Sequence, residues 1–92
     1  MRSKNKPAPN LAERKHILRI KEMPCIVCDK AGPSDAHELT QGAWWTCLPL
    51  CKVCHMHPVY GFHGARRSWK LRKLDELGAL NLLIPKLLGE LQ

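Results

Sequence analysis

Two short cysteine motifs, Cys25-Ile-Val-Cys28 and Cys51-Lys-Val-Cys54, decide the fold of this 92-residue chain. Each motif places two thiols on one tight turn, and 22 residues separate the two motifs. Two such pairs are the ligand set of a closed tetrahedral zinc site, although the interval slightly exceeds the roughly 15 to 20 residues that are usual between them. The sequence therefore predicts a structural zinc ion held by Cys25, Cys28, Cys51 and Cys54.

The length of the chain also favours such a metal. A domain of 92 residues buries only roughly 60–65% of the surface of its unfolded chain, and a metal adds stability that a small core lacks. Disulfides are the alternative use of the cysteines, and Cys47 is expected to be a strand residue. The first residues are polar and basic, and no apolar run approaches roughly 18 residues. We therefore expect a cytoplasmic protein with reduced thiols and no membrane span.

The charge of the chain is strongly positive and clustered. Fifteen Lys and Arg residues against eight Asp and Glu residues give a formal net charge of +7. Twelve of the fifteen cations lie in two blocks, seven in residues 1–22 and five in residues 66–73. Clustered cations are typical of a surface that binds phosphates, so we expect nucleic acid as a partner, with solubility alone as the alternative explanation.

The N-terminal part predicts an arm and a helix. Residues 1–10 carry prolines among cations, which indicates a basic flexible arm. Asn10 followed by Glu13 forms a capping box, in which each side chain accepts a hydrogen bond from the backbone of the other residue. A helix is expected over residues 11–22, and Pro24 ends it because proline disfavours helix in the residue before it.

The middle and the end of the chain predict a small α+β domain. A strand over residues 34–39 and an apolar strand over residues 43–50 would pair as a hairpin, and a short helix would follow in the second cysteine motif. A leucine stripe predicts a helix over residues 65–77 with Gly78 as its stop, and a last helix would begin near Ile84-Pro85. The last helix is apolar, so we expect it to pack on the domain. A homodimer or protein contact through this apolar C-terminal tail is the alternative.

Four histidines within 27 residues remain once the thiolates are assigned to zinc: His37, His55, His57 and His63. A closed zinc site with four thiolates has no vacancy for them. Converging imidazoles can bind a divalent ion, and a further imidazole can act as a general base. We therefore predict a second metal site beside the structural one. The alternatives are a buried, hydrogen-bonded histidine at position 37 and a chance neighbour of the cysteine motif at position 55, while His57 is expected at the surface.

The order of these motifs resembles the HNH nucleases of the ββα-metal class. The first cysteine motif, Ala36-His37 at the end of a strand, and Leu50-Cys51-Lys-Val-Cys54-His55 carry the resemblance. The stretch Gly61-Phe-His63-Gly64 with Arg66 and Trp69 is similar to small phage and prophage members, including the phage recombination-enhancement nucleases. The resemblance covers about half of the chain. It implies a zinc-stapled, treble-clef-like core over residues 24–69, in a single domain over residues 11–92 with an N-terminal helix and C-terminal helices over residues 65–92.

The resemblance further implies a metal-dependent endonuclease that hydrolyses DNA in recombination, repair or processing. His37 takes the place of the general base that deprotonates the attacking water. His55 takes the place of a ligand to catalytic Mg²⁺ or another divalent ion, and His63 that of a further ligand or phosphate contact. Three cations that follow are expected to hold the phosphate backbone of DNA: Arg66, Arg67 and Lys70.

Two positions depart from the family pattern. Ala36 stands where the family often has a metal ligand, and Thr46 stands where it has the Asn that orients the base. Asp35 lies one residue too early, and neighbours on a strand point to opposite faces, so we do not expect Asp35 to replace the missing ligand. These departures leave two alternative functions open. One is a non-catalytic zinc-ribbon module that binds nucleic acid, and the other is a small phage adaptor that binds a host protein.

Overall fold

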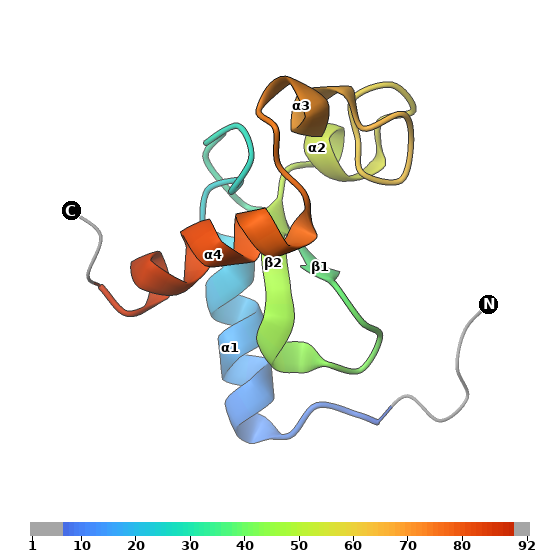
Figure 1. Ribbon diagram of the computed structural model, residues 1–92. Helices are drawn as coiled ribbons and strands as arrows, with labels where there is room; N and C mark the ends of the chain where they lie inside the picture. Colours follow the sequence, from blue (N-terminus) through green and yellow to red (C-terminus); the bar gives the residue numbers. More distant parts are fainter. Residues whose placement is uncertain (1–6, 90–92) are drawn as a thin grey trace.

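A computed structural model describes residues 7–89 of the chain. Most of the predicted basic arm and the last three residues, 90–92, lie outside the described residues. The described part is a small α+β fold with one antiparallel pair of strands (Figure 1). In chain order its elements are α1 (Leu11–Glu22), β1 (Asp35–Glu38), the 3-10 turn η1 (Trp44–Thr46), β2 (Cys47–Leu50), α2 (Lys52–Met56), α3 (Arg67–Leu71) and α4 (Glu76–Leu87).

Helix α1 begins and ends where the sequence predicts. The Asn10 side chain accepts a hydrogen bond from the backbone of Glu13 at 2.8 Å, and the Glu13 carboxylate accepts one from the backbone of Asn10 at 2.8 Å. The capping box is therefore formed. The helix ends two residues before Pro24, as expected. The helix packs against both strands and η1, and Figure 1 shows it beside β2. Its residue Ile20 is fully buried.

Replacing Asn10 by alanine is expected to lower the free energy of unfolding by about 1 kcal/mol, because the Glu13 amide would lose its acceptor. Asn10→Ser is the control, since serine keeps an acceptor and caps helices about as well. Denaturant unfolding followed by circular dichroism measures both changes. Equal stability of Asn10→Ala and the unchanged chain would show that this cap contributes nothing.

The strands pair as a hairpin, but the second strand is shorter than predicted. β1 lies inside the predicted segment, and His37 pairs with Leu48. Residues 44–46 form η1 instead of a strand, because the chain turns back on itself there: the Cys47 thiol donates to the Trp44 carbonyl at 3.1 Å. Cys47 then begins β2, as the expected strand residue. Every residue of β2 is buried, since α1 and α4 both pack against it.

The segment predicted as one helix over residues 65–77 is divided, which corrects the sequence reading. Helix α3 covers only residues 67–71, and the chain breaks at Lys73, whose φ of 55° is left-handed. Asp75 then starts a new helix by accepting a hydrogen bond from the backbone of Gly78 at 2.7 Å. Gly78 therefore lies in the first turn of α4 and does not stop a helix.

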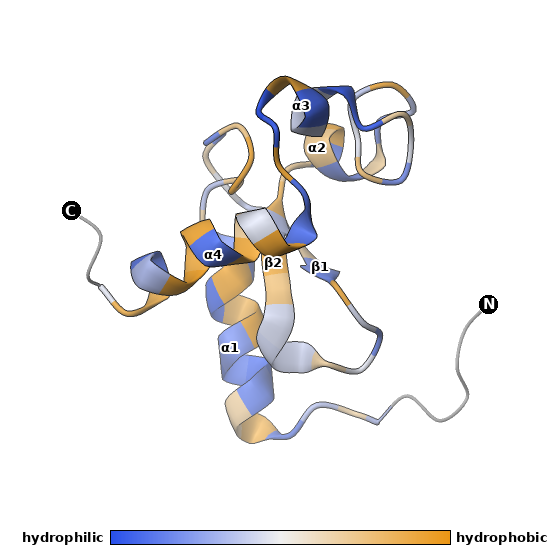
Figure 2. Ribbon diagram, in the orientation of Figure 1, coloured by the Kyte–Doolittle hydropathy of each residue, from blue (hydrophilic) through white to orange (hydrophobic). Residues whose placement is uncertain are grey.

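Helix α4 begins well before the predicted start near Ile84-Pro85, so Pro85 lies inside the helix, close to its end. Ala79 and Leu83 are fully buried, and apolar segments alternate with hydrophilic ones along the helix in Figure 2. Arg19 of α1 donates to the Leu87 carbonyl at 2.6 Å, which fastens the end of α4 to α1. Within residues 7–89 no helix has both the length and the apolar character needed to cross a membrane.

Candidate metal centres

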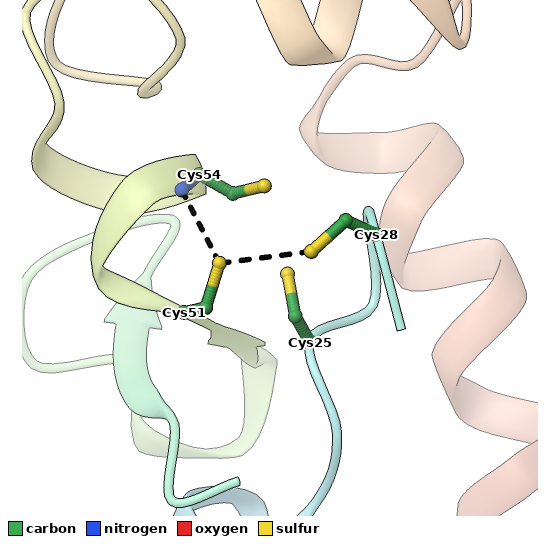
Figure 3. A group of neighbouring side chains, drawn as sticks. All are labelled: Cys25, Cys28, Cys51 and Cys54. Atoms are coloured by element: carbon green, nitrogen blue, oxygen red, sulfur yellow. Dashed lines mark hydrogen bonds between the residues drawn. The ribbon is translucent and has the colours of Figure 1, made fainter. Parts of the chain in front are cut away.

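Four cysteine side chains from two segments point toward one another (Figure 3). Cys25 and Cys28 lie on the turn after α1, while Cys51 and Cys54 lie at the start of α2. The four sulfur atoms lie within 4.8 Å of one another, and those of Cys28 and Cys51 are 3.7 Å apart. Tetrahedral zinc with Zn–S bonds of about 2.3 Å separates its sulfur ligands by about 3.8 Å. This cysteine cluster is therefore positioned to hold zinc, as predicted.

The protonation chemistry of the cysteine cluster also fits a cation. Burial raises the pKa of the Cys28 and Cys54 thiols. Burial acts in the same direction on Cys51, but hydrogen bonds from the Cys54 amide and the Cys28 thiol outweigh it and lower the pKa. All five cysteines of the chain are free thiols in the structure, which disfavours the disulfide alternative. Four adjacent thiolates need positive charge between them, and a bound Zn²⁺ supplies it.

A second group, the histidine cluster, consists of His37, His55 and His63. His37 comes from β1, His55 from α2, and His63 from the loop between α2 and α3. One ring nitrogen of each lies within 4.8 Å of the other two. The His37 side chain is only 5% exposed and His55 is 16% exposed, whereas His63 lies at the surface. The three rings thus run from the floor to the rim of one pocket.

Two glycines allow His63 to reach this pocket. The His63 amide donates to the His55 carbonyl at 3.1 Å, so the loop lies directly on the end of α2. A Cβ atom on Gly61 would lie 2.6 Å from a backbone nitrogen, and one on Gly64 would lie 2.2 Å from a backbone oxygen. Only glycine fits such close approaches. The two glycines of the Gly61-Phe-His63-Gly64 stretch therefore allow the loop to hold the His63 imidazole beside that of His55.

Two carboxylates contact the outer nitrogen atoms of the histidine cluster. Nδ1 of His55 lies 2.9 Å from Oδ2 of Asp35, and Nε2 of His37 lies 2.7 Å from Oε2 of Glu76. The inner nitrogens, Nδ1 of His37 and Nε2 of His55, face each other at 3.3 Å. The four side chains form a continuous row from Asp35 through both imidazoles to Glu76.

Sequence reasoning missed both carboxylates. Asp35 was not expected in the site, but it precedes His37 by two positions on β1 and therefore shares its face. That spacing was a usable signal. No comparable sequence signal pointed to Glu76, because the last helix was predicted to begin near Ile84-Pro85. Thr46 donates its hydroxyl to the Ala43 carbonyl at 3.2 Å, so Glu76 is the side chain that orients His37.

The surroundings of the site favour a negatively charged Asp35 and a neutral imidazole at His63. Burial acts to raise the pKa of Asp35, but hydrogen bonds from Lys52 and His55 outweigh it and lower the pKa. For His63 burial has the opposite effect and lowers the pKa, because it disfavours the charged imidazolium. The nearby charges of His55, His37 and Arg66 lower the pKa of His63 further. A neutral imidazole has a lone pair for a metal ion. His57 stands outside the cluster, where its Nδ1 accepts the Val59 amide at 3.1 Å.

A basic surface adjoins the histidine cluster. The Arg66 guanidinium lies 3.7 Å from the centre of the Phe62 ring, and the Phe62 ring lies 4.8 Å from the His37 ring. Arg66 also donates from Nε to the Phe62 carbonyl at 2.7 Å, which fixes its side chain. Arg67 and Lys70 are exposed on α3, which is strongly hydrophilic in Figure 2. The three predicted phosphate contacts therefore belong to one end of the molecule.

Comparisons of the chain with models of known protein families, with curated proteins and with solved structures find no match.

Proposed function

We propose that this chain is a metal-dependent, HNH-type endonuclease that hydrolyses phosphodiester bonds in DNA. One observation carries the proposal: three imidazoles meet in an open pocket beside a basic surface, separate from the cysteine cluster that would staple the fold. The resemblance to phage and prophage nucleases suggests recombination, repair or processing of phage DNA as the setting.

The histidine cluster has the composition of a catalytic metal site. Catalytic metal sites keep an open position for water or substrate, whereas four thiolates are typical of closed structural sites. His63 lies at the surface, so a phosphate can approach the pocket. A divalent ion at the cluster, Mg²⁺ or another, would supply positive charge for the phosphate in the transition state and for the activation of water.

The surrounding side chains supply binding and orientation. The resemblance gives His37 the role of general base, and Glu76 holds its ring with one nitrogen directed into the pocket. Arg66 is fixed against Phe62 and its charge acts on the nearby His63, so it can meet a phosphate oxygen beside the cluster. Arg67 and Lys70 extend the positive surface along α3. Contacts of this kind hold the DNA backbone in register without reading the bases.

Nicking of supercoiled plasmid tests the proposed activity. With Mg²⁺, Mn²⁺ or another divalent ion, the unchanged chain is expected to nick the plasmid, and His37→Ala is expected to be at least about 100-fold slower. His57→Asn is the control, because asparagine keeps an acceptor for the Val59 amide. Absence of cleavage with every divalent ion, or equal rates for His37→Ala and the unchanged chain, would contradict the proposal.

The basic surface makes a separate prediction about salt. The double variant Arg67→Ala, Lys70→Ala is expected to reduce the slope of log Kd against log salt concentration by about 2, because each lost phosphate contact removes about one released counterion. Lys30→Ala, outside both basic blocks, is expected to leave the slope unchanged. Fluorescence anisotropy with a labelled duplex measures these slopes. Salt-dependent binding without any cleavage would favour the non-catalytic nucleic-acid-binding alternative.

A further inference from the structure

The row of side chains from Asp35 to Glu76 determines where the imidazole protons lie. A carboxylate only accepts hydrogen bonds, so each outer nitrogen must donate to its carboxylate: Nδ1 of His55 to Asp35, and Nε2 of His37 to Glu76. In the neutral form, which is the form that binds a metal ion, each imidazole carries only one N–H group. The inner nitrogens, Nε2 of His55 and Nδ1 of His37, are then both lone-pair acceptors, and they face each other at 3.3 Å.

Two facing lone pairs at this distance repel each other, and a cation between them turns the repulsion into binding. A tetrahedral ion with metal–nitrogen bonds of about 2.0–2.1 Å separates its nitrogen ligands by about 3.3–3.4 Å. The observed 3.3 Å between the inner nitrogens matches that spacing. One nitrogen of His63 also lies within 4.8 Å of a ring nitrogen of each of the other two histidines. The arrangement is that of two ligands held ready for one ion.

We propose that Asp35 and Glu76 are positioning residues, which direct the free nitrogens of His55 and His37 toward each other so that both bind one divalent ion together with His63. The resemblance makes His37 a general base, whereas the geometry makes it a metal ligand. This inference rests on the proposed function for the presence of the ion. Carboxylates that hold metal-binding imidazoles in this way commonly strengthen metal affinity by 10- to 100-fold.

The position of Glu76 links the ion to the folding of the C-terminal part. Glu76 lies 39 residues after His37 and belongs to the first turn of α4. Ala79 and Leu83 bury the same helix against the core. The carboxylate that positions His37 is therefore in place only when α4 is docked.

Titration of the zinc-loaded full chain with Co²⁺, without DNA, tests the proposal. We expect one Co²⁺ per chain beyond the zinc, a loss of affinity of at least about 100-fold in His37→Ala, and losses of about 10- to 100-fold in Glu76→Gln and Asp35→Asn. Asp75→Asn is the matched control, because it removes the same charge one residue away while asparagine still caps α4. Its Co²⁺ affinity should stay within about twofold of that of the unchanged chain.

Nitrogen NMR of the imidazoles gives a readout that a purely structural role would not change. In the unchanged chain His37 should carry its proton on Nε2, and in Glu76→Gln the two tautomers should mix, because an amide can donate as well as accept. This measurement decides the proposal even if His37→Ala fails to fold.

The outcomes separate this inference from the proposed function. Equal Co²⁺ affinity in His37→Ala and the unchanged chain, with cleavage lost in His37→Ala, would overturn the inference and keep the nuclease. Equal Co²⁺ affinity in Glu76→Gln and Asp75→Asn, with one tautomer in both, would overturn the positioning role. The expected losses of Co²⁺ affinity without cleavage by the unchanged chain would support the metal site and remove the nuclease.

Discussion

Cys54→Ala is expected to abolish the folded state at 25 °C. In small zinc domains the metal contributes about 10 kcal/mol or more to folding, which is comparable with the whole stability of a typical domain. Cys54 is 2% exposed in the core, and its backbone carbonyl accepts a hydrogen bond from the buried Trp69 indole at 2.8 Å. Alanine keeps this carbonyl, but loss of the thiolate would release the zinc ion and with it the turn that holds the carbonyl against Trp69.

Cys47→Ala is the matched control for this prediction. Cys47 is also buried, at 1% exposure, but it lies outside the cysteine cluster. The same chemical change there should lower the free energy of unfolding by only about 1–2 kcal/mol and leave zinc bound. Circular dichroism with elemental analysis of zinc measures both variants. Cooperative melting of Cys54→Ala at the temperature of Cys47→Ala would contradict a structural role for the cluster.

His55→Ala is expected to have the opposite outcome, although His55 directly follows Cys54. The fold and the zinc should remain, while the rate of plasmid nicking should fall by about 1,000-fold. His55 lies between the Asp35 carboxylate and the His37 ring, so its removal takes a ligand from the centre of the histidine cluster. A catalytic ion stabilises the transition state by several kcal/mol, and each 1.36 kcal/mol is about a tenfold change in rate.

Single-turnover nicking at saturating divalent ion measures this rate, with His57→Asn as the control two residues away. Nicking by His55→Ala at the rate of the unchanged chain would exclude His55 from the site. Loss of zinc in His55→Ala would show that the two clusters are not independent.

The parts of the fold that depend on neighbouring residues could be predicted from the sequence. The capping box at Asn10 and Glu13 and the stop at Pro24 are set by contacts within a few residues, and α1 has the predicted bounds. The two cysteine motifs bring their own turn geometry, so their convergence followed from spacing. The first strand was also predicted, because it lies between a turn and a loop.

The C-terminal helices could not be predicted in the same way. The stripe of Leu71, Leu74 and Leu77 suggested one helix, yet Leu71 and Leu77 are 73% and 71% exposed. Their spacing is therefore not that of a buried face. Helix α4 instead begins after Asp75, which caps it. This start depends on the packing of Ala79 and Leu83 against segments that are distant in the sequence.

The residues of the candidate site also differ in how far they could be predicted from the sequence. The resemblance to HNH nucleases singled out three of the spare histidines, and the structure brings their rings together. Asp35 could have been added from its two-residue spacing to His37 on one strand. Glu76 could not, because only the docking of α4 brings it within 2.7 Å of His37.

Counting metal ions per chain tests the central claim most directly. After equilibration with zinc and a second divalent ion such as Co²⁺, elemental analysis of the full chain should find two metal ions, one at the cysteine cluster and one at the histidine cluster. His55→Ala should then hold one, with its zinc unchanged. A single metal ion per chain that is equally present in the unchanged chain and in His55→Ala would contradict the account.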